Sequence, residues 1–369
     1  MRTEEIPATG HTEDTGTVTT AVTLNTDGVR TYNCTVCDEV LRTEPITKPE
    51  LYESPIDAET GLAATKSSKY IYFGIFPKTV LPANSTLTVD ETVSVKMGAA
   101  TYYKGSNGEY YAKVKENASI TGTRYKYSDG TQAKKSDAES YRYFKVEPIK
   151  WKVITDSYSG KCLLLAEDIL TANVPYYEGD TSRTIAGTTV YPNNYKYSTI
   201  RAYLNGKYES DDTQSKTAYE NKGFLQTAFT AEAQNLIAVT TVDNSAASTT
   251  DSLDHSGLHL GEAKDYACAD TKDKIFLLSI KEATSYGFPA YDRCGEGNAR
   301  IRKTTDYAMA NHAVQYSTAG YGGDWWLRSP LYNDSCDARD VIQDGNAGYY
   351  SWVYDTSLGV VPALSISLQ

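Results

Sequence analysis

The apolar residues of this chain occur in short runs, and this pattern limits its possible folds more than any other feature. Segments 149–153 and 364–368 alternate apolar and polar residues with the period of a half-buried strand. Two continuous apolar runs, 163–165 and 275–280, are typical of central strands buried on both faces. No run approaches the ~18 residues of a membrane-spanning helix. The sequence therefore predicts short elements around buried strands, with no transmembrane segment.

Three short helices are predicted from residues that favour helix starts and ends. Ser198 can cap a helix that ends at Gly206, and Thr230 can cap a second one. Ser279 and Glu282 have the spacing of a capping box at the start of a third.

Charge and aromatic content narrow the classes of partner. The chain has 369 residues with 47 Asp and Glu against 36 Lys and Arg, and the resulting charge of -11 disfavours binding to a nucleic-acid backbone. It has 31 Tyr but only 7 Phe, and tyrosine rings suit contact surfaces as well as cores. We expect the tyrosines between 102 and 143 to pack a sheet.

The cellular compartment is inferred from composition alone. The opening MRTEEIPATG has no charged segment followed by an apolar stretch, so we expect either an intracellular protein or one whose secretion signal and anchor lie outside this sequence. The six cysteines are too few and too scattered for a disulfide scaffold. A composition rich in Thr, Ser, Asn and Tyr favours an extracellular or cell-surface protein.

Residues 1–47 are predicted to be a β-rich repeat, part of a longer array. Arg2-Thr3-Glu4 recurs as Arg42-Thr43-Glu44, and Val, Thr and Tyr alternate with polar residues around a turn at Asp27-Gly28. The segment resembles the Gly-His-Thr…Tyr-x-Cys-x-x-Cys repeats of surface proteins from Gram-positive gut bacteria.

The pair Cys34 and Cys37 leaves three interpretations open. Two thiolates at this spacing can bind one zinc ion, with His11 as the remaining candidate ligand. No second cysteine pair lies nearby, so an unligated pair or a disulfide is the alternative.

The rest of the chain is predicted to be a linker, 48–68, and a main domain, 69–369. Hairpin signals at Asn107-Gly108 and Asp129-Gly130 predict a hairpin insertion at about 78–142. Segment 242–273 is polar and aperiodic, so we expect a long loop.

Loop 242–273 contains groups that could bind a metal. Its carboxylates could hold Ca²⁺, although the regular spacing of a calcium loop is missing; they are Asp243, Asp251, Asp254, Asp265, Asp270 and Asp273. His255 and His259 with Glu262 have helical metal-site spacing, but Gly257 and Gly261 argue against a helix there.

No motif for enzymatic catalysis stands out. The four histidines lie near no Gly-x-Ser-x-Gly elbow, and no phosphate-binding Gly-rich loop is followed by Lys-Ser or Lys-Thr. We therefore expect no enzyme, no catalytic residues and no cofactor other than the calcium considered above.

The last 45 residues have an unusual composition. From Trp325 onward there is no Lys, Glu or Met, and all five acids from Asp334 to Asp355 are Asp. Randomising the adenines of Asn codons would give such a set, and block 331–337 fits it completely, whereas Gln343 and Trp352 do not. A series of Gly-, Asn-, Asp- and Tyr-rich hairpins would show the same bias.

Five motifs in order resemble a domain family abundant in gut Gram-positive bacteria, over residues 69–369. They are Tyr70-x-Tyr72-Phe73-Gly74, Tyr143-Phe144-x-x-Glu147-Pro148-Ile149-Lys150-Trp151-x-Val153, Ser198-x-x-Arg201-x-x-Leu204-Asn205, Asp273-Lys274-x-Phe276-Leu277-Leu278-Ser279 and Trp325-Trp326-Leu327-Arg328-Ser329-Pro330. The closing Gly-Val-Arg-Pro-Ala-Leu of that family departs at one position, where this chain has Val361.

That family is similar to the C-type-lectin-like fold of formylglycine-generating (sulfatase-modifying) enzymes and of the variable proteins of diversity-generating retroelements. The resemblance implies an α+β fold with short helices, small antiparallel sheets and long loops. It also implies a variable ligand-binding face within about 325–360, with these contact residues: Tyr332, Asn333, Asp334, Asp337, Asp340, Asp344, Asn346, Tyr349, Tyr350, Trp352, Tyr354 and Asp355.

The function expected from these features is the binding of an unknown protein or glycan ligand at a cell surface. Rigid aromatic rings and small polar side chains are the usual means of such recognition. One alternative is a thiol-dependent modifying enzyme of the formylglycine-generating type, in which Cys336 would pair with Cys294 or Cys268. The other is a structural surface domain without a specific ligand.

Overall fold

The computed structural model describes residues 10–119, 125–212, 218–249, 266–288 and 299–369. The fold is mostly β, with 37% strand and 11% helix. The expectation of an α+β, C-type-lectin-like fold with small sheets is therefore wrong. Its strands join into one large sheet and several small ones, most of them antiparallel, and its helices are too short to form a layer of their own.

The largest sheet has nine strands arranged around the 18-residue strand β9. The length of β9 lets it pair with β8 near its start, with β10 near its end, and with β5 between them. The strand order is β16-β21-β10-β9-β8-β7-β6, and β5 pairs with both β9 and β4. The bounds are β4 (Ile56–Asp57), β5 (Tyr70–Val80), β6 (Val89–Met97), β7 (Ala100–Gly105), β8 (Tyr110–Lys115), β9 (Tyr141–Tyr158), β10 (Lys161–Ala166), β16 (Ile275–Phe276) and β21 (Ala363–Ile366).

The predicted hairpin insertion explains why this sheet is larger than expected. Its Asn107-Gly108 turn joins β7 to β8 as predicted, but β6, β7 and β8 extend the main sheet instead of standing apart from it. Tyr102, Tyr110 and Tyr111 are buried against this sheet, as expected, whereas Tyr141 is exposed.

The two predicted central strands have different outcomes. Run 163–165 lies in β10, inside the sheet, and is fully buried, which confirms the prediction. Run 275–280 is equally buried, but only Ile275–Phe276 forms a strand. Ser279 accepts a hydrogen bond from the backbone of Glu282, and this cap starts a helix at Ile280.

The helices begin at the predicted caps, Ser198, Thr230 and Ser279, and each has fewer than eight residues. Among the described residues, no helix is long and apolar enough to cross a membrane. The helices are α1 (Thr199–Asn205), α2 (Phe224–Ala228), α3 (Ala231–Leu236), α4 (Ala246–Thr249), α5 (Ile280–Ala283) and α6 (Asp306–Ala310), with 3₁₀ turns η1 (Ser136–Ala138) and η2 (Tyr195–Tyr197).

The expected loop 242–273 contains regular structure in its described residues, because β14 pairs with β15 at its two ends and α4 follows β14. The small sheets are β1 (Thr17–Thr20), β2 (Gly28–Asn33) and β3 (Val40–Ile46); β11 (Asp168–Ile169) with β17 (Lys303–Thr304); β12 (Arg183–Ile185) with β13 (Thr188–Val190); β14 (Thr240–Val242) with β15 (Thr271–Asp273); and β18 (Trp325–Pro330), β19 (Asp337–Val341) and β20 (Tyr349–Trp352).

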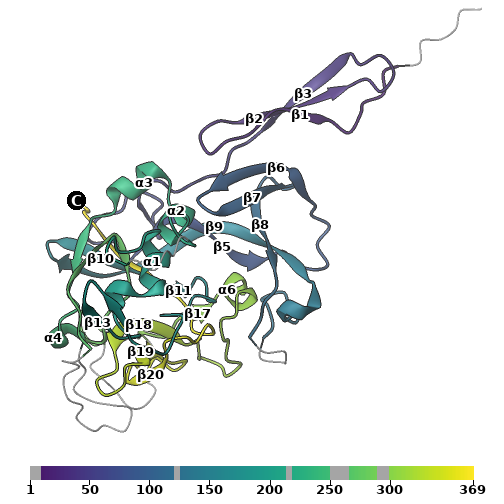
Figure 1. The fold of residues 1–369 in the computed structure, drawn as a ribbon. Helices are drawn as coiled ribbons and strands as arrows, with labels where there is room; N and C mark the ends of the chain where they lie inside the picture. Colours follow the sequence, from purple (N-terminus) through teal and green to yellow (C-terminus); the bar gives the residue numbers. More distant parts are fainter. Residues whose placement is uncertain (1–9, 120–124, 213–217, 250–265, 289–298) are drawn as a thin grey trace, which may run out of the picture.

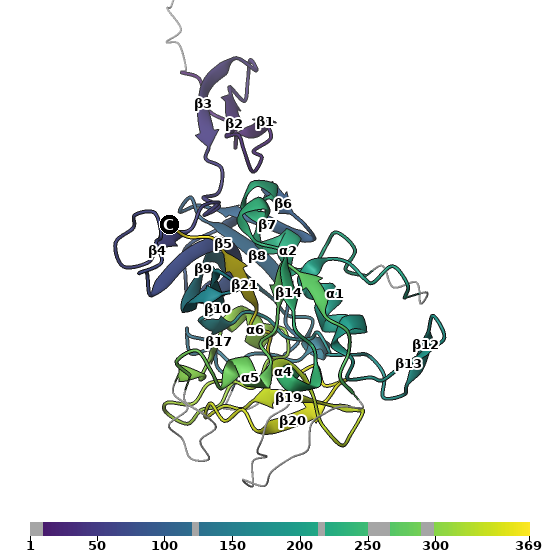
Figure 2. The same cartoon turned by 90° about the vertical axis from the view of Figure 1, so that its left-hand side faces the viewer.

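The N-terminal sheet and the β18–β20 sheet lie at opposite ends of the molecule (Figure 1), whereas the C-terminus itself lies near β4 (Figure 2). The β1–β3 sheet projects from the side of the nine-stranded sheet formed by β6 and β7 (Figure 1). The β18–β20 sheet lies at the other end in both views (Figure 2). Whatever β20 presents to solvent therefore faces away from the N-terminal sheet.

Candidate functional site

The base of the C-terminal segment is a buried pair of strands. Every residue of β18 and β19 is buried, and Trp325 and Trp326 have no exposed surface. Large aromatic rings that are fully buried in a close-packed interior resist displacement. The two strands thus give β20, which pairs with β19, a rigid support.

An ion pair and a hydrogen bond connect Arg328 of β18 to the surrounding elements. Its guanidinium donates to the carbonyl of Leu277 at 2.7 Å and forms an ion pair with Glu282. Glu282 also accepts the hydroxyl of Tyr158 at 2.7 Å. Burial opposes ionisation of Glu282, but the charge of Arg328 outweighs it and holds the pKa of that carboxyl below its usual value.

Other residues of the resemblance motifs are also structural. Arg201 donates to Asp273 at 2.9 Å, and the side chain of Asn205 bonds both the N–H and the carbonyl of Ile275. Val361, the one departure from the closing motif, lies fully buried in the apolar core. These motif residues hold the elements together and do not form a surface site.

The surface above this base is the edge strand β20. Along β20 exposure alternates, so Tyr350 and Trp352 point outward, opposite Arg339 and Asp337 of β19. Trp352 is 62% exposed and stacks on Tyr354, with ring centroids 5.5 Å apart and planes 27° apart. An exposed, stacked aromatic pair offers a large contact area at low entropic cost.

A loop and a distant segment border the aromatic pair. Cys336 lies within hydrogen-bond distance of the carbonyl of Asp180, with its sulfur 3.0 Å from that oxygen. The side chain of Asn193 donates to the carbonyls of Asp334 and Asp337, at 2.8 and 3.0 Å. Segment 180–193 therefore fixes the loop before β19. We call Asp180, Asp334, Tyr350, Trp352 and Tyr354 the C-terminal face.

Three of the predicted contact residues turn inward. Asp340 is buried and accepts a hydrogen bond from Ser351 at 2.6 Å, and burial raises its pKa to about 7. Asp337 is buried beside Trp352 in the sheet register, and burial raises its pKa to about 6. Asn346 accepts the backbone N–H of Gly348 at 2.9 Å within a turn.

The twelve predicted contact residues therefore fall into three sets. Exposed are Asn333, Asp334, Tyr350, Trp352 and Tyr354; half-buried are Tyr332, Asp344, Tyr349 and Asp355; buried are Asp337, Asp340 and Asn346.

Two acids near the C-terminal segment were not predicted. Asp180 reaches the C-terminal face from a different part of the sequence. Asp324 accepts the hydroxyl of Tyr316 at 2.9 Å, and burial raises its pKa to about 6. Neither lies in a motif, so only the packing of the chain brings them here.

Residues 159–368, more than half of the chain, match the family described as Domain of unknown function (DUF6273). The chain belongs to the DUF6273 family. The matched region includes β10, β21 and the whole β18–β20 sheet, whereas β1 to β9 begin before it.

The other comparisons add no relative. No curated protein and no solved structure matches the chain.

Metal-binding groups lie elsewhere in the molecule. Of the acids proposed to hold calcium, Asp273 is paired with Arg201, and Asp243 and Asp270 accept backbone N–H groups of Ser245 and Asn244. Asp251, Asp254 and Asp265, like His255, His259 and Glu262, are outside the described residues. In the part of the chain that the structure describes, the group that could hold a metal ion is His11, Cys34 and Cys37.

Proposed function

We propose that this DUF6273 protein binds a protein or glycan ligand at a cell surface through the C-terminal face. The observation that carries the proposal is the exposed, stacked pair formed by Trp352, at the end of the edge strand β20, and Tyr354, in the turn that follows it, above a fully buried support. Exposed aromatic side chains that pack on each other, with acids around them, are typical of recognition sites. Because they are exposed, they add little to the packing of the core.

The acids around the pair favour a ligand that donates hydrogen bonds. Asp334 is exposed, and Asp180 lies beside Cys336. Carboxylates accept hydrogen bonds from sugar hydroxyls or from cationic side chains. An acidic nucleic-acid backbone would be repelled by these groups and by the net charge of -11.

The arrangement of the molecule supports surface display. The C-terminal face and the β1–β3 repeat lie at opposite ends (Figure 2). A repeat array extending from the N-terminal end would carry the C-terminal face away from its attachment point.

A direct test measures binding of the full chain to an array of purified glycans and extracellular protein domains. We expect a bound ligand whose affinity falls about tenfold or more with Trp352→Ala or Tyr354→Ala, as for an interface hot spot. Tyr141→Ala is the matched control, because Tyr141 is 52% exposed but lies in β9, outside the C-terminal face. Unchanged binding in both face variants would refute the proposal.

We further propose that a diversity-generating retroelement varies this segment. The exposed set tolerates substitution because its side chains make few packing contacts, whereas Asp337, Asp340 and Asn346 are enclosed. A complete genome should then contain a near-copy of the coding stretch for about residues 325–365, differing at adenines, beside a reverse-transcriptase gene. Absence of that copy would leave an ordinary ligand-binding surface domain.

The thiol-enzyme alternative gains less support. Burial raises the pKa of both Cys268 and Cys336, and a raised pKa lowers the fraction of reactive thiolate. Cys294, the other suggested partner, lies outside the described residues. Loss of an assayed modifying activity in Cys336→Ser would favour this alternative.

A further inference from the structure

The β1–β3 sheet has almost no apolar core at the end formed by the β2–β3 connection. Among residues 10–47, the buried apolar side chains are Val22, Cys34 and Ile46, and Val22 and Ile46 pack against the strands of the main sheet. Near the cysteines, Val36 is 87% exposed and Val40 is 57% exposed. Units of this size usually need a metal ion or a disulfide to stay folded.

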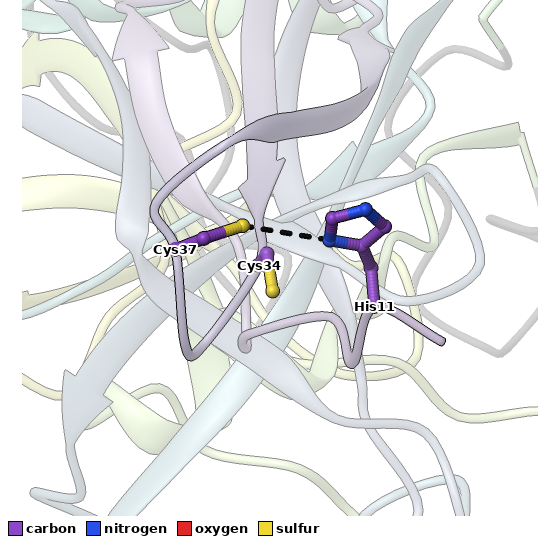
Figure 3. Close-up of side chains that lie close together, drawn as sticks. All are labelled: His11, Cys34 and Cys37. Atoms are coloured by element: carbon purple, nitrogen blue, oxygen red, sulfur yellow. Dashed lines mark hydrogen bonds between the residues drawn. The ribbon is translucent and has the colours of Figure 1, made fainter. Parts of the chain in front are cut away.

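Three metal-ligating side chains meet at that end (Figure 3). The ligand atoms of His11, Cys34 and Cys37 all lie within 4.8 Å of one another, and Cys37 Sγ is 3.5 Å from His11 Nδ1. With bonds of 2.0 to 2.3 Å to a tetrahedral zinc ion, such a sulfur and nitrogen would lie about 3.6 Å apart. The side chains therefore need little movement to share one ion.

The backbone holds these three residues in place before any ion binds. Cys34 donates its N–H to the carbonyl of Glu39 at 2.8 Å, which closes the loop that carries Cys37. Thr35 donates to the carbonyl of Thr12 at 2.9 Å, which fixes the segment that carries His11. The second of these hydrogen bonds joins segments 23 residues apart in the sequence.

Two neighbouring groups contact the ligand side chains. The N–H of Val36 points at Cys34 Sγ from 3.5 Å. Glu39 lies 3.4 Å from His11 Nε2, so it can hold the proton on that nitrogen and leave Nδ1 free to face the sulfur atoms.

We propose that His11, Cys34 and Cys37 form a structural zinc site that holds together the outer end of the β1–β3 sheet, with Glu39 as a positioning residue. Thiolates and imidazole suit zinc better than calcium or magnesium. The three side chains leave a fourth coordination position for water or for a group from outside this sheet.

The test uses the full chain, reduced and freed of metal, titrated with Co²⁺ as a spectroscopic probe and then with Zn²⁺. We expect one Co²⁺ per chain with sulfur-to-cobalt charge-transfer absorption, displaced by one Zn²⁺. His11→Ala and Cys37→Ser should each lower the affinity by well over tenfold, and Glu39→Gln by about tenfold, as for residues that orient a ligand. Cys336→Ser and His312→Ala are matched controls that remove one thiol and one imidazole elsewhere, and they should bind like the native chain.

A second measurement separates a structural ion from casual binding. Zinc should slow hydrogen exchange of the β1–β3 amides, because an ion bound only to the folded sheet stabilises it, and should leave β18–β20 unchanged. The proposal is overturned if no charge-transfer band appears, if the ligand variants bind like the controls, or if Cys34 and Cys37 remain joined as a disulfide when the protein is isolated with zinc present.

Discussion

At the scale of single residues, burial divides the C-terminal segment into side chains that can contact a ligand and side chains that support them. Trp352 and Tyr350 project from β20 into solvent, whereas Asp340 lies enclosed on the neighbouring strand. From the sequence, these three residues were equally plausible contact residues, because composition gives the type of a side chain but not the direction in which it points.

Asp340 should make the stability of the protein depend on pH. Burial raises its pKa to about 7, while the same group in an unfolded chain ionises near pH 3.9. Between these values the folded state binds more protons, so this group's contribution to the free energy of unfolding falls as pH rises from about 4 to about 7, by up to about 1.4 kcal/mol per pH unit.

The measurement is urea denaturation of the native chain and of Asp340→Asn across this pH range. The amide oxygen of Asn can still accept the Ser351 hydroxyl but cannot ionise, so the variant should gain stability relative to the native chain as pH rises. Parallel pH profiles of the two proteins would contradict the assignment.

At the scale of elements, short strands and helices depend on particular backbone positions. β5 contains an irregularity between Tyr72 and Ile75, and Gly74 within it has φ of 70°. A Cβ there would lie 2.5 Å from the ring of Phe229 and 2.7 Å from the carbonyl of Ala228. Glycine is therefore required by both conformation and space.

Gly74→Ala and Gly108→Ala separate these two requirements. Gly108 also has positive φ, 86°, but a Cβ there would meet no atom within 4 Å. We expect Gly108→Ala to cost about 1 kcal/mol from backbone strain alone, and Gly74→Ala to cost about 1–3 kcal/mol more from the clash. Thermal unfolding of the two variants checks this, and equal costs would show that β5 shifts to accommodate the methyl group.

At the scale of the whole molecule, the N-terminal sheet is attached to the main sheet through one contact region. Ile46 packs into the cluster formed with β6–β8, and Tyr110 donates to the carbonyl of Thr47 at 2.7 Å. Arg30 forms an ion pair with Asp90, but both side chains are partly exposed and such pairs contribute little. Apolar packing thus dominates the attachment.

Ile46→Ala should loosen this attachment. Ile46 is 7% exposed, so its truncation should cost about 2–4 kcal/mol, whereas Val40→Ala, at a 57% exposed position of the same strand, should cost less than about 0.5 kcal/mol. Limited proteolysis between residues 47 and 55 reports the difference. Equal cleavage of both variants would mean that other contacts hold the sheet.

The sequence alone determined the short elements of this protein: helix starts at Ser198, Thr230 and Ser279, the Asn107-Gly108 hairpin and the buried strand β10. These features depend on interactions between residues that are close in the sequence, so local sequence patterns predict them. Tertiary structure alone decided that β6–β8 join the main sheet, that 277–280 leaves it, and that Asp180 lies beside Cys336 while Asp340 turns inward. Those outcomes depend on pairing and burial between segments far apart in sequence, where side chains compete for space that local patterns do not describe.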